Sequence, residues 1–95
     1  MTVYVDRARH PFKGMIMCHM LADTEEELHQ MARRLGMKRE WFQPKSSPHY
    51  DIDENRRAKA LEMGAQEISR RDLVDLIRRI RREPRTFWLP GHELK

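Results

Sequence analysis

Histidines and aspartates recur in this chain next to segments that are otherwise apolar. His19 lies inside the run MIMCHMLADT (15–24), and Asp23 follows the apolar part of that run. A second group, His49 and Asp51 with a tyrosine between them, ends a segment rich in proline and serine. Imidazole nitrogens and carboxylate oxygens bind divalent metals, and they also transfer protons in metal-free catalysis. These residue types therefore predict a polar site that binds a ligand or a metal. Whether the site also catalyses hydrolysis is left open by the sequence.

Roles within this site are assigned by residue type. The candidate catalytic residues, which are also the candidate ligands of zinc, manganese or a similar divalent ion, are His19, His49 and Asp51. The candidate ligand-binding residues are Asp6, Asp23, His29, Tyr50 and Arg57, the last as a contact for an anion. No HExxH, CxxC or HxxxH spacing is present, so the sequence does not choose between a metal-dependent and a metal-free site. It also leaves open whether the protein is an enzyme.

Each of these residues has a structural interpretation as well. A histidine in an apolar strand, such as His19, is more often a core residue that bonds a carbonyl or a carboxylate. Asp23 is as well explained as part of a helix start, and Asp51 as a loop residue that bonds nearby amides. His10 and His92, each beside a turn residue, are interpreted as exposed. We favour a site because separate segments deliver these groups to the neighbourhood that the predicted fold creates.

The hydrophobic pattern predicts the elements that position these residues. Strands are predicted at 2–6, 15–21 and 65–68. Capping signals and apolar residues that recur every three or four positions predict helices. The helices begin after Thr24, Asp53 and Ser69 and end before Gly36, Gly64 and Pro84. The segments 7–14 and 37–50 are predicted to be irregular, with Trp41 and Phe42 packing the second of them onto the core.

The element order β-β-α-α-β-α predicts an α/β fold, a single small domain with a short mixed or parallel sheet and three helices. We expect this domain to span residues 1–83 and a C-terminal tail to span 84–95. If the first two strands are parallel neighbours, Asp6 and Asp23 lie at the same edge of the sheet, where ligands of open α/β sheets bind. The loop that carries His49 is long enough to fold over that edge.

Length and composition restrict the class of protein. The chain has 95 residues, of which 39% are hydrophobic and 36% charged, so it forms one domain with a modest core. Its longest apolar run is too short to cross a bilayer, and no secretory signal follows Met1. We therefore expect a cytoplasmic protein without membrane contact. The one cysteine, Cys18, lies in an apolar strand, where burial makes a thiol a poor nucleophile.

A second function, of a different class, is indicated by the basic C-terminal third of the chain, which holds most of the excess in a net charge of +4. The residues that would contact nucleic acid are Arg71, Arg78, Arg82, Arg85 and Trp88. Arginines bind phosphates and an aromatic ring stacks on bases, although a solvated helix face is the favoured explanation of this pattern. The alternative function is a non-enzymatic accessory module that binds nucleic acid or a partner protein. The sequence is also compatible with binding of a small anionic ligand and with a homo-oligomer.

Five motifs occur in order between residues 2 and 75: VDRARHP, CHMLADT, ELH, HYDI and GAQEISRRDLV. Taken together, they resemble a family of small bacterial and bacteriophage proteins described as a domain of unknown function. The resemblance implies a bacterial or phage origin and a single-domain protein, and it brings no known activity. The sequence after residue 82 departs from the family, which indicates a binding role particular to this tail.

Overall fold

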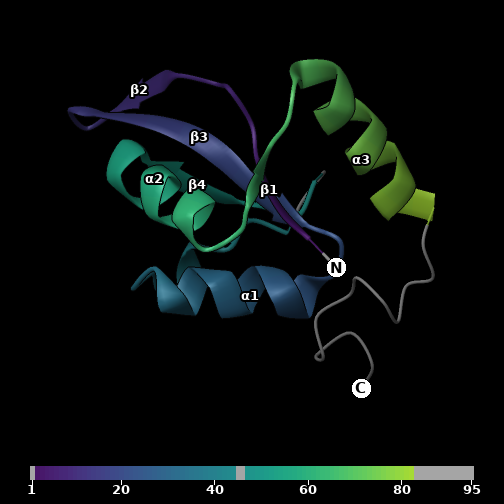
Figure 1. The fold of residues 1–95 in the computed structure, drawn as a ribbon, viewed down its shortest axis with the longest axis horizontal. Helices are drawn as coiled ribbons and strands as arrows, with labels where there is room; N and C mark the ends of the chain where they lie inside the picture. Colours follow the sequence, from purple (N-terminus) through teal and green to yellow (C-terminus); the bar gives the residue numbers. More distant parts are fainter. Residues whose placement is uncertain (1, 45–46, 83–95) are drawn as a thin grey trace.

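One long strand, β3 (Met15–Ala22), organises the sheet and carries the central histidine of the predicted site (Figure 1). The computed structural model describes residues 2–44 and 47–82, so the predicted tail, with Arg85 and Trp88, lies outside the described residues. The other elements, in chain order, are β1 (Val3–Val5), β2 (His10–Phe12), α1 (Glu25–Arg34), a turn of 3₁₀ helix (Arg39–Trp41), β4 (Tyr50–Asp53), α2 (Glu54–Glu62), β5 (Gln66–Glu67) and α3 (Arg70–Arg82). The predicted α/β class, with three helices and a mixed sheet, is confirmed.

The strands that pair with β3 all run antiparallel to it. β2 pairs with its first half, β1 with its second half and β4 with its middle. Because Met17 pairs with both His10 and Asp53, β2 and β4 lie on opposite sides of β3. β5 adds a parallel partner to β1, which makes the sheet mixed. The middle of β3 is therefore enclosed by strands on both sides.

The first two predicted strands, β1 and β3, are antiparallel and not parallel neighbours. The chain between them folds back through β2 and the turn Lys13–Gly14, in which both residues have positive φ, 50° and 80°. Such a two-residue turn joins antiparallel strands, whereas a parallel pair needs a crossover of about a dozen residues. The expectation that Asp6 and Asp23 share an edge is therefore wrong. The Asp6 amide bonds the middle of β3, and the Asp23 amide bonds the start of β1.

Two strands form in segments that were predicted to be irregular. β2 lies within 7–14, and β4 begins at the last residue of 37–50. Both are only three or four residues long, so pairing with β3 stabilises them and no long alternating pattern marks them. Phe42 packs against the core as predicted. The prediction that Trp41 packs there is wrong, because this residue is 44% exposed.

The helices begin at the predicted caps. The side-chain oxygens of Thr24 and Ser69 each accept a hydrogen bond from the amide three residues further on, at 3.2 and 3.1 Å. Asp53 is the N-cap of α2, but its carboxylate bonds Arg56 instead of a backbone amide. α1 ends before Gly36, whose φ of 75° stops the helix. None of the helices in the described chain is long and apolar enough to cross a membrane.

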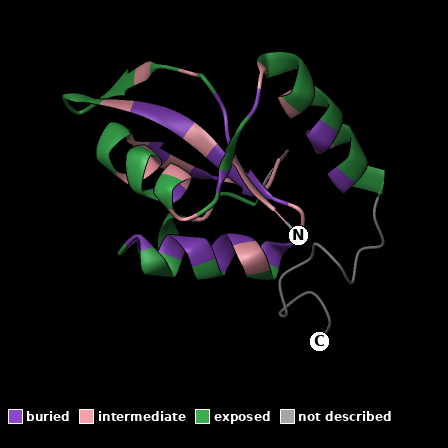
Figure 2. Cartoon of the chain, in the orientation of Figure 1, coloured by how far each residue is buried: buried purple, intermediate pink, exposed green. Residues whose placement is uncertain are grey.

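α1 and α2 pack on one face of the sheet and α3 packs on the other (Figures 1 and 2). Alternation along β3 directs Cys18 and Met20 into the first of these cores and Leu21 towards α3. The apolar contacts of α3 are with Leu21, Ile68 and the neighbouring tyrosine of β1, at one end of that face. His19 lies on the same face beyond these contacts, and 33% of its side chain stays exposed.

Candidate functional site

The register of the sheet places polar residues from several strands on the face that α3 only partly covers. His19 of β3 pairs with Asp51 of β4, while His10 of β2 pairs with Met17. Asp6, directly after β1, bonds the His19 carbonyl oxygen through its backbone amide at 3.1 Å. Paired residues, and residues two apart on a strand, point to the same face of a sheet. We call His10, His19, His49 and Asp51 the histidine cluster.

Asp6 orients the His19 ring. Its Oδ2 lies 2.6 Å from His19 Nδ1, and its Oδ1 accepts hydrogen bonds from the amides of His19 and Ala8 at 2.9 and 3.2 Å. A carboxylate only accepts, so neutral His19 carries its proton on Nδ1 and leaves the Nε2 lone pair for the cluster. Burial raises the pKa of Asp6, but the hydrogen bonds from His19 outweigh this effect and hold the pKa below its ordinary value. The same side-chain bond raises the pKa of His19.

His49 is held in the same way on the other side of the cluster. Its Nδ1 lies 2.6 Å from the carbonyl oxygen of Ser47, which can only accept, so neutral His49 also has its lone pair on Nε2. This Nε2 lies 3.3 Å from Asp51 Oδ1, and His19 Nε2 lies 3.9 Å from the same oxygen. Asp51 Oδ2 accepts a hydrogen bond from Gln43 at 2.8 Å. Asp51 is therefore fixed by one oxygen and presents the other to two histidines.

His10 adds a third imidazole to the cluster. Its ring centroid lies 5.2 Å from that of His19. One ligand atom from each of His10, His19 and Asp51 lies within 4.8 Å of the other two. In the described chain, three buried side-chain atoms lack a hydrogen-bond partner, and two of them are His10 Nε2 and Asp51 Oδ1. Leaving a buried polar atom unpaired costs free energy, so these two atoms indicate a place for a ligand.

Two members of this neighbourhood, His10 and Gln43, were not predicted from the sequence. His10 was interpreted as an exposed turn residue, but it is only partly exposed and belongs to a strand. The available signal was the Lys13–Gly14 pair between two apolar residues, a pattern that favours a two-residue hairpin turn. That hairpin brings His10 beside Met17 and hence near His19. No local pattern singles out Gln43, which reaches Asp51 through the isolated bridge to His49.

Asp23, one of the predicted ligand-binding residues, lies away from the cluster. Its Oδ1 accepts hydrogen bonds from the Tyr4 hydroxyl and from Arg79, at 2.9 and 2.6 Å. Its Oδ2 accepts from the backbone amide of Thr2 at 2.9 Å. Asp23 therefore ties α3 to the start of β1, at the opposite end of that strand from Asp6.

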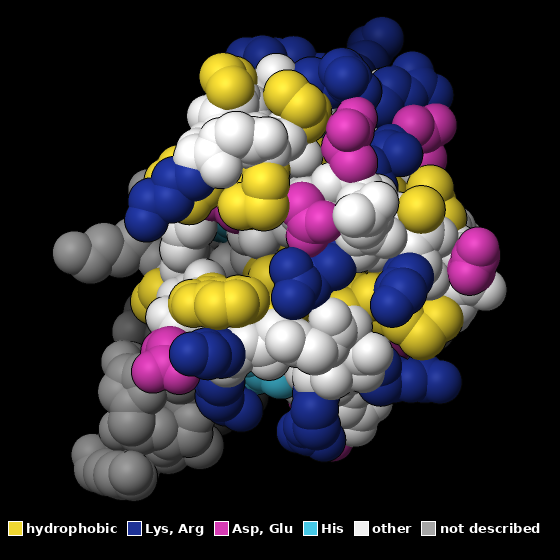
Figure 3. Space-filling model, turned by 90° about the vertical axis from the view of Figure 1, so that its left-hand side faces the viewer, with side chains coloured by type: hydrophobic (Ala, Val, Ile, Leu, Met, Phe, Trp, Pro, Cys, Tyr) yellow, Lys and Arg dark blue, Asp and Glu magenta, His cyan; other side chains and the backbone are white. Residues whose placement is uncertain are grey.

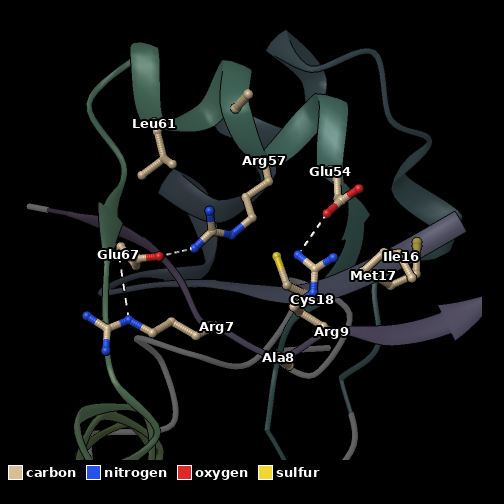
Figure 4. A pocket seen from close by; sticks show the side chains of 11 residues that line it. Arg7, Ala8, Arg9, Ile16, Met17, Cys18, Glu54, Arg57, Leu61 and Glu67 are labelled. Atoms are coloured by element: carbon tan, nitrogen blue, oxygen red, sulfur yellow. Dashed lines mark hydrogen bonds and ion pairs between the residues drawn. The ribbon is translucent and has the colours of Figure 1, made fainter.

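Arg57 lines a separate cavity of about 440 Å³ between α2 and the sheet (Figure 4). The ion pairs there are Arg57–Glu67, Arg7–Glu67 and Arg9–Glu54. Arg57 also donates to the backbone oxygen of Asp6 at 3.2 Å, so it holds the chain that carries Asp6. Burial raises the pKa of the Cys18 thiol in this cavity to about 12, as expected for a poor nucleophile. The charge that Arg57 could offer to an anion is therefore shared with Glu67, which pairs with Arg7 as well.

His29 and Tyr50 form a buried network on the face covered by α1. His29 Nε2 lies 3.1 Å from Glu25 Oε2, and its Nδ1 lies 2.7 Å from the Tyr50 hydroxyl. Because the carboxylate only accepts, neutral His29 donates from Nε2 and accepts the tyrosine proton at Nδ1. The Phe42 ring packs edge-on against His29, with centroids 4.6 Å apart. Burial lowers the pKa of His29 and raises that of Tyr50, and the sheet separates both side chains from the histidine cluster.

The lowered pKa of His29 predicts a loss of stability in acid. A histidine whose folded pKa lies below its ordinary 6.5 binds fewer protons in the folded than in the unfolded chain. Its contribution to the free energy of unfolding is therefore complete above about pH 6.5 and is lost as the pH falls through the folded pKa. We expect His29→Gln, which keeps a donor and an acceptor, to be less sensitive to acid than the wild type.

Urea unfolding of both proteins at a series of pH values between about 7 and 5 measures this difference. His19, whose raised pKa acts with the opposite sign, is present in both proteins and cancels in the comparison. Parallel stability curves would contradict the prediction.

The arginines of the alternative function lie on the outer side of α3. Arg71, Arg78 and Arg82 are exposed. Arg79 is bonded to Asp23 and joins α3 to the sheet. The other two residues of this set fall in the tail, outside the described residues. The described part of the set is therefore accessible to a partner but holds no cavity or converging arrangement.

Comparison with known proteins identifies one family. A family model described as "Protein of unknown function (DUF4031)" matches residues 3–80, which is most of the chain and includes every residue of the histidine cluster. Searches of curated proteins and of solved structures returned no match.

Proposed function

We propose a function from the geometry of the histidine cluster, because the family to which the chain belongs, DUF4031, is described as one of unknown function and suggests no activity. The cluster binds a divalent metal, zinc or a similar ion such as manganese, and uses it to hydrolyse a polar, anionic substrate. His10, His19 and Asp51 hold the metal. His49 lies beside it as the acid–base residue. The protein works in the cytoplasm, where its single buried cysteine stays reduced.

The observation that carries this proposal is the convergence of ligand atoms from three strands. His10, His19 and Asp51 present atoms within 4.8 Å of one another, and His10 Nε2 and Asp51 Oδ1 are buried without a hydrogen-bond partner. The donor set of two imidazoles and a carboxylate suits zinc, and three protein ligands leave a fourth position for water or substrate. The Asp6–His19 bond is typical of metal-binding histidines, which donate the N–H of their other ring nitrogen to a carboxylate or a carbonyl.

The neighbouring groups support hydrolysis. A divalent ion at the cluster would lower the pKa of a water molecule in the open position. The water oxygen forms a bond to phosphorus or to a carbonyl carbon, and the bond to the leaving oxygen or nitrogen breaks. His49 Nε2, whose lone pair faces Asp51 at 3.3 Å, accepts the proton from water and returns it to the leaving group. The reaction consumes one water molecule and needs no oxidant or reductant.

Elemental analysis of protein purified in chelator-free buffer tests the metal. We expect about one equivalent of zinc or manganese per chain, or stoichiometric uptake when the ion is added to chelator-treated protein. If the purified protein neither retains nor takes up a divalent ion, the hypothesis of a metal site is rejected. The cluster would then have to act through His19, His49 and Asp51 by acid–base chemistry alone.

A further inference from the structure

A groove leads away from the histidine cluster between the β2–β3 turn and the segment after α1. It has a volume of about 500 Å³, and His10 and Asp51 form part of its wall. The β2–β3 turn contributes Phe12, Lys13 and Met15 to the lining, and the opposite wall includes Met37 and Trp41. We call this space the hairpin groove. Whatever occupies it lies directly against two of the proposed metal ligands.

The rims of the hairpin groove carry the largest exposed apolar side chains of the described chain. Phe12 is 52% exposed, Trp41 is 44% exposed and Met15 is 41% exposed. Exposed apolar groups gathered around one depression mark a binding surface, whereas single exposed groups are ordinary. The two flat rings that line the groove suit ligands with flat faces.

Positive charge lies beside both rings. Lys13 Nζ is 5.4 Å from the centre of the Phe12 ring, and Lys38 Nζ is 5.9 Å from that of the Trp41 ring. Neither lysine forms an ion pair within the described part of the chain. Arg56 also lies over Trp41, although Asp53 pairs with its charge. Figure 3, which views the molecule from the left of Figure 1, shows hydrophobic and basic side chains next to one another on that face, with some acidic side chains among them.

We propose that the hairpin groove binds a single-stranded nucleic acid, with bases stacked on Phe12 and Trp41 and the backbone beside Lys13 and the cluster. Aromatic platforms next to cations are the means by which proteins bind single strands without sequence preference. A phosphodiester that passes from one ring to the other lies at the wall formed by His10 and Asp51. The inference rests on the proposed function and names its substrate class.

The composition of the groove favours this occupant over others. An acidic peptide would use the lysines but leave the two exposed rings without a stacking partner. A duplex keeps its bases paired and stacked on each other, so it offers only phosphates. A free mononucleotide has the right chemistry but carries a single base, whereas the groove offers two rings. A single strand contacts both rings and the lysines, and at the cluster a bound metal would offset the charge of Asp51, which lines the groove together with Asp53.

Fluorescence anisotropy with a labelled single-stranded DNA of mixed sequence tests the proposal on the full chain. Replacing both rings (Phe12→Ala with Trp41→Ala) should weaken binding about 100-fold, and each single variant about 10-fold, because each ring supports one stacked base. Both side chains are exposed, so the variants should fold, which circular dichroism checks. Lys13→Gln should weaken binding a few-fold and flatten its salt dependence.

The matched control removes positive charge elsewhere. Arg71→Gln with Arg78→Gln and Arg82→Gln neutralises three exposed arginines of α3 and should leave affinity within about three-fold of the wild type. The inference is overturned if this control loses binding while the ring variant keeps it, which would assign the nucleic acid to α3. Equal affinity for the duplex, or equally effective competition by a poly-glutamate peptide, would also overturn it. If a mononucleotide competes as well as the oligonucleotide does, the ligand is a single nucleotide, and the proposal of a single-stranded ligand is overturned.

The metal content of the same variants separates this inference from the proposed function. The ring variant should retain the full metal content, because neither ring belongs to the histidine cluster. If no protein binds metal but the ring variant still loses the oligonucleotide, the groove binds single strands and the metal hypothesis fails. If metal is bound and no oligonucleotide binds, the metal site stands and the groove inference fails.

Discussion

Replacing His19 with alanine should abolish metal binding while leaving the protein folded. The change removes one of three proposed ligands, so we expect metal affinity to fall by more than about 100-fold, beyond the usual effect of changing a residue that only orients a ligand. Stability should fall by only about 1–2 kcal/mol, since the His19 side chain is partly exposed and donates one hydrogen bond to Asp6. Isothermal titration with zinc measures the first effect, and thermal unfolding of the metal-free protein measures the second.

His29→Gln is the matched control for this variant. It replaces the histidine that lies on the opposite face of the sheet, so metal affinity should stay within about two-fold of the wild type. In His19→Ala, the loss of metal affinity compared with the loss of stability decides whether His19 is a site residue or a core residue. If melting temperature and metal binding fall together, even with metal in excess, His19 is a core residue and the site hypothesis is wrong.

Replacing Asp6 with alanine should cause a large loss of stability. The carboxylate is 4% exposed and accepts hydrogen bonds from two backbone amides and from the His19 ring. Without it, buried N–H groups lose their acceptor and the ring loses its orientation. We expect a loss of about 3 kcal/mol, which for a domain of this size lowers the melting temperature by about 10–20 °C.

Two variants make this prediction sharper. Asp75→Ala, which removes an exposed carboxylate from α3, should change the melting temperature by no more than about 2 °C. Asp6→Asn should keep most of the stability, because its amide oxygen still accepts from the backbone. Its NH₂ group donates to His19 Nδ1, however, which moves the imidazole proton to Nε2 and removes the lone pair that binds metal. Metal affinity should therefore fall about 10- to 100-fold. Full metal affinity in Asp6→Asn would contradict the orienting role of Asp6.

Local features of the sequence determined the helices, the buried strands and the class of the fold. Thr24 and Ser69 cap helices because their hydroxyls accept bonds from amides of the same turn, an interaction within three residues of chain. The apolar run around Cys18 predicted a central strand, since a strand covered by helices on both faces needs apolar side chains on both. Such interactions are short in sequence, so a pattern of neighbouring residues is enough to predict them. The same run placed His19 in a strand, as observed.

Only the tertiary structure decided which polar residues meet. The direction of β1 against β3 depends on a hairpin turn between them, and it moved Asp23 away from Asp6. The same hairpin brought His10 into the cluster, and pairing of β4 with β3 placed Asp51 opposite His19. Strand pairing joins residues that are distant in the chain, and its register sets the face to which each side chain points. Three- and four-residue strands carry too little local pattern to reveal that register, so the site forms only when the sheet does.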